Sequence, residues 1–380
     1  MNDLAALHAP LADALTTAVR RVMDSGWYIL GPEVAAFEAA FADYCGAGYR
    51  AAGSGGLHAV GVGNGTDAIE LALAGVGAGR GSRIALAANA GGYGTTAVLA
   101  LGAEPVYVDV DEDTATLDPA LLDRAGHEAG FDAVLVTHLY GRLADMPALR
   151  AVADAHGAKV VEDCAQAHGA AHGVTAGGRR AGVWGDAAAF SFYPTKNLGA
   201  LGDAGAVVTA DPDVAERVRR LRQYGWDRKY HQVTGPARNS RMDELQAAVL
   251  GVKLPHLDAW NARRVAVAAR YAATIRHPKL TLPDVAAPSH VAHLYVLRST
   301  DRDALSSHLR AHGVPHDVHY PVPDHRQPVH GDRFADLDLP VTERLCAEVL
   351  SLPCHPGLDP AEADRVAAVL NVFGDAACTP

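Results

Sequence analysis

Residues 186–210 read DAAAFSFYPTKNLGALGDAGAVVTA and contain two apolar runs, 186–192 and 204–210, separated by a glycine-rich loop. Each run is continuously apolar, which is typical of strands whose two faces are both covered. Pro194 breaks the first run because it has no backbone N–H to donate to a neighbouring strand. This stretch therefore predicts two buried strands, with Lys196 in the loop that follows the first.

Similar apolar runs occur upstream and alternate with helical patterns. The expected strands are 83–88, 105–110, 132–139 and 159–163. The expected helices are 65–76, 117–126 and 145–157. This succession predicts an α/β fold with a mostly parallel sheet covered by helices.

The C-terminal part of the chain has a different pattern. A long helix is expected over 241–275, kinked near Pro255. An apolar segment at 290–299 and a helical pattern at 302–313 then predict a smaller α+β domain. We expect a large domain over residues 1–250 and a small domain over 251–380.

Composition excludes several classes of protein. The net charge of −11 argues against nucleic acid as a partner, because phosphate contacts need a basic face. No apolar run reaches the ~18 residues of a membrane span, and the first ten residues, MNDLAALHAP, do not resemble a signal peptide. Five scattered cysteines form neither a metal-ligand spacing nor a disulfide framework. We expect a cytoplasmic protein.

Lysine is scarce in this chain, which has five lysines and 28 arginines. Lys196, in a glycine-rich loop after a predicted buried strand, therefore suggests a chemical role that arginine could not fill. Arginine cannot form an imine and is not deprotonated near neutral pH. The alternative is that Lys196 is an ordinary surface lysine.

Two further segments follow the same logic, because ligands of parallel sheets bind beyond the carboxyl ends of the strands. Asp163 ends the expected strand 159–163, although it could simply cap a helix. Residues 61–73, GVGNGTDAIELAL, lead into a helix whose first N–H groups can bind phosphate. Their glycine spacing does not fit a dinucleotide-binding fingerprint, and we see no apolar strand leading directly into them.

A phosphate-binding helix end, a carboxylate and an isolated lysine are together the groups that pyridoxal 5'-phosphate requires. The helix end would hold the phosphate, and the carboxylate would keep the pyridinium nitrogen protonated. The lysine would form a Schiff base and move protons.

Several segments closely resemble the DegT/DnrJ/EryC1/StrS family of sugar aminotransferases, from about residue 25 to the end of the chain. They are 26–46, 63–73 (GNGTDAIELAL), 102–111, 138–146, 161–170 (VEDCAQAHGA), 190–209 and 239–250 (NSRMDELQAAVL). The resemblance implies the fold type I aminotransferase architecture and a homodimer with shared active sites.

The resemblance also implies residue roles. Lys196 resembles the Schiff-base lysine, Asp163 the pyridinium partner and Gln166 the ligand of the cofactor's phenolic oxygen. The remaining roles are phosphate ligands (Gly65, Thr66, Ser191), a phosphate ligand from the other subunit (Asn239) and substrate-site candidates (Arg241, His319, Tyr320, His325).

One segment departs from the family pattern. The family usually has an aromatic residue after the strand at 83–88, and this residue stacks on the cofactor ring. Here the segment reads AANAGGYG, and ungapped counting puts Gly91 at that position. Tyr93 either fills the space after a shift of the loop or packs as a half-buried aromatic at the helix start.

The histidines and cysteines offer alternative sites. His316, His319, His325 and His330 lie close together in sequence, but prolines and the absence of a helical spacing argue against a metal site. We therefore expect no bound metal. Cys164, beside Asp163, is expected to be a small core residue and not a reactive thiol.

The expected activity is transfer of an amino group from an amino acid, with L-glutamate the expected donor, to a nucleotide-linked keto-deoxysugar. The NSR form of residues 239–241 resembles enzymes acting on dTDP-3-keto-6-deoxyhexoses, which give 3-amino sugars. The alternatives are a 4-keto sugar or cyclitol ketone as substrate, a sugar dehydratase, and a regulatory relative. Retention of Lys196 argues against the dehydratase, because some relatives that became dehydratases carry histidine instead.

Overall fold

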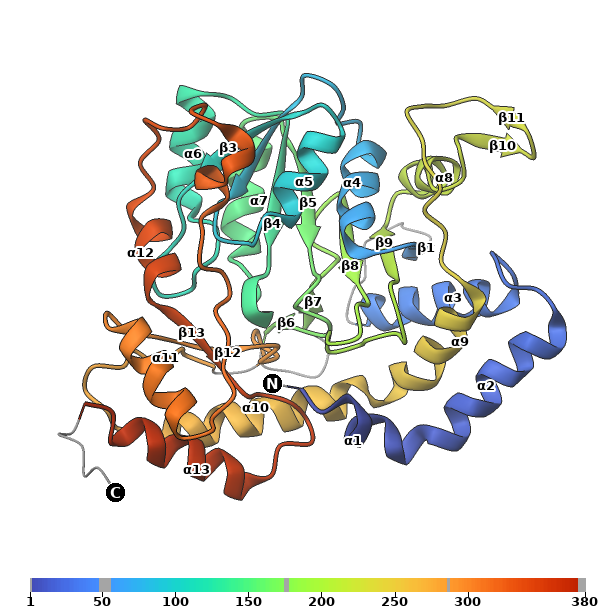
Figure 1. The fold of residues 1–380 in the computed structure, drawn as a ribbon. Helices are drawn as coiled ribbons and strands as arrows, with labels where there is room; N and C mark the ends of the chain where they lie inside the picture. Colours follow the sequence, from blue (N-terminus) through green and yellow to red (C-terminus); the bar gives the residue numbers. More distant parts are fainter. Residues whose placement is uncertain (1, 48–55, 174–177, 286–287, 375–380) are drawn as a thin grey trace.

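The computed structural model describes residues 2–47, 56–173, 178–285 and 288–374 (Figure 1). Its centre is a seven-stranded sheet in the order β1-β9-β8-β5-β4-β2-β3. The strands are β1 (His58–Val62), β9 (Gly205–Thr209), β8 (Ala187–Ser191), β5 (Lys159–Asp163), β4 (Ala133–Thr137), β2 (Arg83–Ala87) and β3 (Glu104–Val108). Strand β9 pairs antiparallel with both of its neighbours, β1 and β8, and the other neighbouring strands of the sheet pair in parallel. The prediction of a mostly parallel α/β sheet is confirmed.

Helices cover both faces of this sheet. One apolar cluster joins the sheet to α4 (Gly65–Gly75), α5 (Tyr93–Ala100) and α8 (Pro212–Leu221). A second joins the opposite face to α3 (Pro32–Gly46), α6 (Pro119–Glu128), α7 (Met146–Ala155) and α9 (Glu244–Lys253). Because both faces are buried, the strands need no polar alternation, which explains their continuous apolar runs.

The C-terminal part packs around its own apolar cluster, below the sheet in Figure 1. Its elements are α10 (Leu257–Thr274), β12 (Tyr295–Arg298), α11 (Arg302–Ala311), β13 (Val349–Leu352) and α13 (Pro360–Asn371). Strands β12 and β13 form an antiparallel pair. The division of the chain near residue 250 stays a prediction.

The remaining elements are short or peripheral. The helices are α1 (Leu4–His8), α2 (Ala12–Ser25) and α12 (Pro340–Glu348), with 3-10 turns at Ala9–Leu11, Leu139–Gly141, Leu254–His256, Asp324–Arg326 and Pro328–His330. Two small hairpins are formed by β6 (Ala171–His172) with β7 (Arg179–Arg180) and by β10 (Trp226–Arg228) with β11 (His231–Gln232).

The helix ends follow from local chemistry. The side chains of Asn64, Asp118 and Asp145 accept hydrogen bonds from first-turn N–H groups of α4, α6 and α7. The expected kink at Pro255 is confirmed, since a 3-10 turn there separates α9 from α10. The first of these two helices begins at Glu244 and not at Arg241, because Asp243 is still extended and bridges to Ile29.

One reading of the sequence was wrong. Strand β1 ends at Val62 and does lead directly into the loop before α4. Its five residues, HAVGV, include a glycine and lie among other glycines, so the segment was not recognised as an apolar run. The strand is defined by its pairing with β9, in which Val60 lies opposite Val207.

Among the described residues, none of the helices combines the length and apolar character needed to cross a membrane.

Candidate active site

Asp163 and Lys196 lie at the same edge of the sheet. Asp163 is the last residue of β5, and Lys196 follows β8, which pairs with β5 in parallel. Lys196 is half-buried. Burial lowers the pKa of its ammonium to about 8, and the Asp163 carboxylate partly opposes that shift. The two side chains are thus close enough to affect each other's charge, as the rule for carboxyl ends of parallel strands predicts.

The carboxylate of Asp163 is held by two donors. Its Oδ2 accepts from Thr137 Oγ1 at 3.2 Å, and its Oδ1 accepts from the backbone N–H of Ala165 at 3.0 Å. Burial nevertheless raises the pKa of Asp163 above its usual range, although the hydrogen bond from Ala165 and the charge of Lys196 oppose the shift. A buried carboxylate of this kind gains from a cationic partner.

Gln166 joins two tyrosines beside this carboxylate. Its Oε1 accepts from the backbone N–H of Tyr140 at 2.6 Å, and its Nε2 donates to Tyr320 Oη at 3.1 Å. These contacts orient the amide with its N–H groups on the side of Tyr320. Gln166 can therefore donate to an oxygen placed there.

The N-terminus of α4 packs closely against the end of β8. A Cβ on Gly65 would come within 2.4 Å of the Cβ of Ser191, so only glycine fits against the end of β8. Thr66 follows in the first turn, where helix N–H groups point outward. The loop before α4 is fixed further by Gly63, whose N–H donates to Ser240 Oγ at 3.0 Å.

The residue after Lys196 anchors its loop in a buried polar network. Asn197 Nδ2 donates to Asn261 Oδ1 at 2.7 Å, and Asn197 Oδ1 lies 2.9 Å from His293 Nδ1. Asn261 Nδ2 in turn donates to the carbonyl of His168 at 2.7 Å. Burial lowers the pKa of His293 well below its usual value, so it stays neutral in this network. These bonds fix the backbone that carries Lys196 against α10.

Tyr320 occupies the space beside Gly91, the position at which the family usually has an aromatic residue. A Cβ on Gly91, whose φ is +77°, would lie 2.7 Å from the Tyr320 ring. Asp324 holds the two segments together, since it accepts from Gly92 N–H at 2.8 Å and from Thr95 Oγ1 at 2.9 Å. Tyr93 is exposed, and its ring meets that of Tyr320 edge-on at 6.1 Å.

Asn239 lies at the surface and Arg241 is half-buried, on either side of Ser240. Asn239 is exposed, while its neighbour Ser240 is bound to the loop before α4. The guanidinium of Arg241 lies 5.6 Å from the centroid of the Tyr224 ring. Their predicted roles at a second subunit's site remain predictions.

The two candidate histidines differ. His319 Nδ1 lies 2.8 Å from Ser351 Oγ, and the backbone carbonyl of His319 accepts from Tyr140 Oη, which places it near Gln166. His325 Nε2 instead lies 3.0 Å from Glu343 Oε1. No contact among the described residues joins His325 to Lys196 or Gln166, so its predicted role has no support from its neighbours.

The four histidines of residues 316–330 have separate partners. His316 pairs with Ser306 and His330 with Tyr107. Among the described residues, these histidines do not belong to any group close enough to hold a metal. Cys164 is fully buried, and burial raises the pKa of its thiol well above the usual value, which suits a core residue.

Sequence reasoning missed three residues that support the site: Thr137, Tyr140 and Asn197. Thr137 ends β4 directly beside Asp163 in the parallel register, so the strand-end rule could have found it. Tyr140 and Asn197 act through contacts with distant segments, and their positions in the sequence carry no such signal.

The residues present fit pyridoxal phosphate. Gly65 brings the first turn of α4, with its free N–H groups, closer to Ser191 than a residue with a Cβ would allow. Lys196 offers an amine whose pKa burial lowers to about 8, and the buried Asp163 gains from a cation.

Comparison with known proteins gives a consistent result. The model of the DegT/DnrJ/EryC1/StrS aminotransferase family matches residues 11–371. The chain is 48% identical to the erythromycin biosynthesis sensory transduction protein EryC1 of Saccharopolyspora erythraea, over 97% of this chain and 98% of that protein. It is 47% identical to the dTDP-3-amino-3,4,6-trideoxy-alpha-D-glucose transaminase of Streptomyces venezuelae, over 96% of this chain and 93% of that one.

A solved structure is similarly close. The crystal structure of S. venezuelae DesV in complex with a ketimine intermediate superposes with a TM-score of 0.89 at 46% identity. The match covers 99% of this chain and 98% of that chain.

Proposed function

Because the chain belongs to the DegT/DnrJ/EryC1/StrS aminotransferase family and is a pyridoxal-phosphate-dependent sugar aminotransferase, we propose that it aminates a dTDP-3-keto-6-deoxyhexose. L-Glutamate is the proposed amino donor and a dTDP-3-amino sugar the product. The observation that carries the choice of position is the 47% identity to a transaminase named for a 3-amino sugar.

The chain's own residues supply positioning and proton transfer. When bound, the cofactor supplies an aldehyde that takes up the amino group and a ring that accepts electrons. Asp163 keeps a proton on the ring nitrogen through a charge-assisted hydrogen bond. Gln166 donates to the phenolic oxygen, and Gly65, Thr66 and Ser191 hold the phosphate. Lys196 Nζ removes the Cα proton of the donor and later delivers a proton to the sugar carbon.

We also propose that Tyr320, and not Tyr93, supplies the aromatic face beside the cofactor ring. The support is the room that Gly91 leaves and the bond from Gln166 Nε2 to Tyr320 Oη. The loop's departure from the family pattern is then compensated by a side chain from a segment more than 200 residues away.

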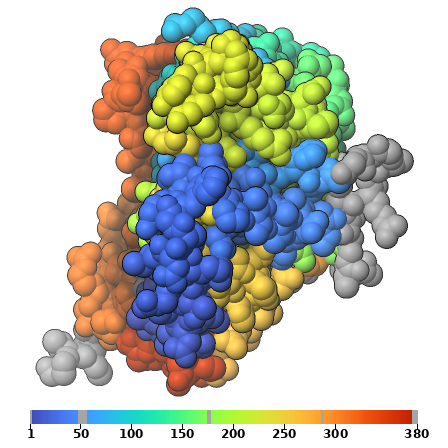
Figure 2. All heavy atoms as spheres, turned by 90° about the vertical axis from the view of Figure 1, so that its right-hand side faces the viewer, coloured from blue at the N-terminus to red at the C-terminus, as the bar shows by residue number. Residues whose placement is uncertain are grey.

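A homodimer is the proposed assembly. Apolar side chains are exposed on α2 and the turn after it, and on the segment 224–233, which lie on one face of the molecule in Figure 2 (blue and yellow-green). Trp27 is 58% exposed and Tyr230 78%. Such a concentration of exposed aromatic residues is typical of a protein interface. Tyr193 and Leu201 of the Lys196 loop are exposed as well, so the interface would border the active site.

Mixed dimers test whether the sites are shared. An inactive Lys196→Ala chain and an inactive Asn239→Ala chain are mixed under conditions in which subunit exchange is verified. If Asn239 serves the neighbouring site, each hybrid dimer contains one intact site and activity returns. Absence of recovery after proven exchange would show that each site is built from one chain.

Product analysis tests the substrate. The purified enzyme is incubated with glutamate and either a dTDP-3-keto- or a dTDP-4-keto-6-deoxyhexose, and the products are identified by NMR. Reaction of the 3-keto sugar alone is the expected result, because moving the ketone by one carbon requires another sugar pose. Conversion of only the 4-keto sugar, or of a cyclitol ketone, would overturn the assignment.

A regulatory protein is the second candidate, favoured by the name of the 48% identical relative, a sensory transduction protein. One measurement distinguishes the two. A catalytic protein converts its bound cofactor to the amine form when glutamate is added, which changes the absorbance spectrum. A protein that only binds the cofactor leaves the spectrum unchanged.

A further inference from the structure

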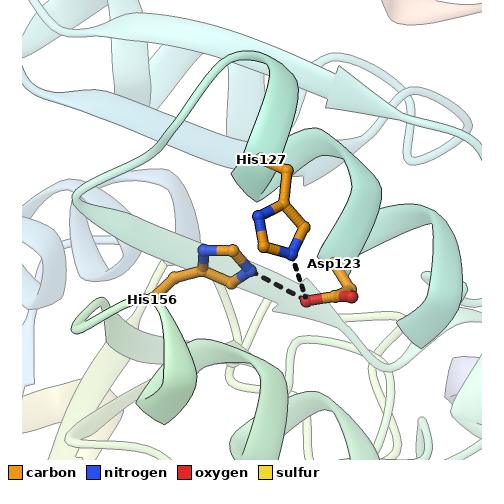
Figure 3. A group of neighbouring side chains, drawn as sticks. All are labelled: Asp123, His127 and His156. Atoms are coloured by element: carbon orange, nitrogen blue, oxygen red, sulfur yellow. Dashed lines mark hydrogen bonds and ion pairs between the residues drawn. The ribbon is translucent and has the colours of Figure 1, made fainter.

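A group of three side chains with metal-binding atoms lies apart from the site described above. Figure 3 shows Asp123 and His127 on one helix and His156 on a neighbouring segment, with both imidazole rings turned toward the carboxylate. The Nε2 atoms of His156 and His127 lie 2.9 and 3.7 Å from the same oxygen, Asp123 Oδ1. We propose that these residues form a binding site for a divalent transition-metal ion such as Zn²⁺.

The backbone brings the ligands together without strain. Asp123 and His127 are four residues apart on α6 and therefore lie on the same helix face. His156 is the C-cap residue that follows α7, and α7 packs beside α6. Its ring lies 4.8 Å from that of His127, centroid to centroid.

Gly126 makes room for the third ligand. A Cβ at this position would come within 2.5 Å of His156 Cε1. Glycine inside a helix costs about 1 kcal/mol relative to alanine, and here it lets the imidazole lie against the helix. The centroid of the Phe131 ring lies 5.5 Å from that of the His156 ring, and the His156 side chain is only 14% exposed. One ligand is thus fixed before any ion binds.

The spacing suits a tetrahedral ion. The three ligand atoms lie within 4.8 Å of one another. Tetrahedral zinc with bonds of about 2.0–2.1 Å separates its ligands by about 3.3 Å. A small rotation of His127, whose side chain is 73% exposed, closes the difference. Water can complete the coordination from the solvent side, and two imidazoles with one carboxylate suit Zn²⁺, Ni²⁺ or Cu²⁺.

A second group of potential metal ligands differs from this one in its burial and in its hydrogen-bond partners. His138, Glu162 and Cys164 also lie close together, but they are fully buried. The Glu162 carboxylate already accepts three backbone N–H groups of segment 182–185 and faces His138 Nε2 at 2.9 Å. His138 Nδ1 accepts a backbone N–H from Ala144. Those groups are satisfied within the protein, whereas His127 and Asp123 are open to solvent.

The place of the proposed site indicates its role. The end of α6 precedes β4 and the end of α7 precedes β5, so the site lies at the edge of the sheet opposite to Lys196. An ion there would clamp α6 to α7 and take no part in amino transfer.

Calorimetric titration of the holoenzyme with Zn²⁺, after treatment with a chelator, tests the proposal. One ion should bind per chain with micromolar or tighter affinity. His127→Gln and Asp123→Asn should each weaken binding at least about tenfold. His312→Gln is the matched control, since His312 also pairs with a histidine, His308, at 4.4 Å between ring centroids.

Thermal denaturation gives a second readout. Zn²⁺ should raise the melting temperature of the unmodified protein and of the control, but not that of His127→Gln. Because His127 is largely exposed, that variant should fold normally. No binding in the micromolar range, or binding that His127→Gln and Asp123→Asn leave unchanged, would overturn the proposal.

Discussion

The molecule holds two lysines in buried surroundings. Lys196 lies in the loop after β8, and Lys253 is the last residue of α9. Burial lowers the pKa of each ammonium to about 8. Lys196 is partly open to solvent and close to Asp163. Lys253 is 1% exposed, donates to the carbonyl of Gly199 and lies 2.9 Å from His8 Nε2.

The comparison shows that a lowered pKa does not by itself identify a catalytic amine. The two lysines differ in exposure and charge: Lys196 is partly open to solvent and near the Asp163 carboxylate, whereas protein encloses Lys253. The two are also linked, since Gly199 belongs to the loop of Lys196. Lys253 therefore stabilises the loop that carries Lys196, through its hydrogen bond to the carbonyl of Gly199.

Replacing Lys196 should have the largest effect. Lys196→Ala should lower the rate of amino transfer by roughly 10²–10⁴-fold through the loss of proton transfer alone. Lys196→Arg should do the same, because guanidinium cannot form an imine. Steady-state kinetics with glutamate measure the loss. If Lys196→Ala were active and Lys253→Ala inactive, the roles assigned to the two lysines would be reversed.

Asp163→Asn should lower kcat/KM by about tenfold to a hundredfold, which corresponds to the ~1.5–3 kcal/mol of a hydrogen bond to a charged group. A neutral amide cannot hold the ring nitrogen protonated. Thr137→Val is the control, since it removes one neutral donor to Asp163 and keeps the charge. Equal losses in the two variants would mean that Asp163 serves only as part of a local hydrogen-bond network.

Tyr320→Ala should weaken binding of pyridoxal phosphate to the apoprotein by about two- to tenfold, given the ~0.5–1.5 kcal/mol of an aromatic stacking contact. Tyr93→Ala should change it little, because that side chain is exposed. Fluorescence titration of the apoprotein measures both. A larger loss for Tyr93→Ala would restore Tyr93 as the stacking residue.

Lys253→Met should have the smallest effect, visible in the pH dependence of stability. A lysine with a folded pKa near 8 and an unfolded pKa of 10.5 binds fewer protons when folded, so stability rises as pH increases between these values. The variant should show a shallower rise in the apoprotein, measured by urea denaturation from pH 8 to 10. An unchanged slope would contradict the assigned pKa of Lys253.

The sequence predicted the elements that depend on local pattern. Six of the seven strands of the sheet were found as apolar runs, and α4, α6 and α7 were found from their helical periodicity. Strand β1 was missed, since its five residues include a glycine and are defined as a strand by their pairing with β9. Because β1 was not predicted, the sequence analysis also found no strand leading into the loop before α4.

For the site, the sequence by itself determined which residues end the strands and hence that Asp163 and Lys196 meet at one edge. The carboxyl ends of parallel strands lie together, but the position of Lys196 within its loop also depends on the tertiary contacts of Asn197. The tertiary structure alone decided that Tyr320 fills the space beside Gly91 and that His325 turns to Glu343. Tyr320 and Gly91 meet across more than 200 residues, and side-chain packing at such separations depends on the whole fold, which no local pattern encodes.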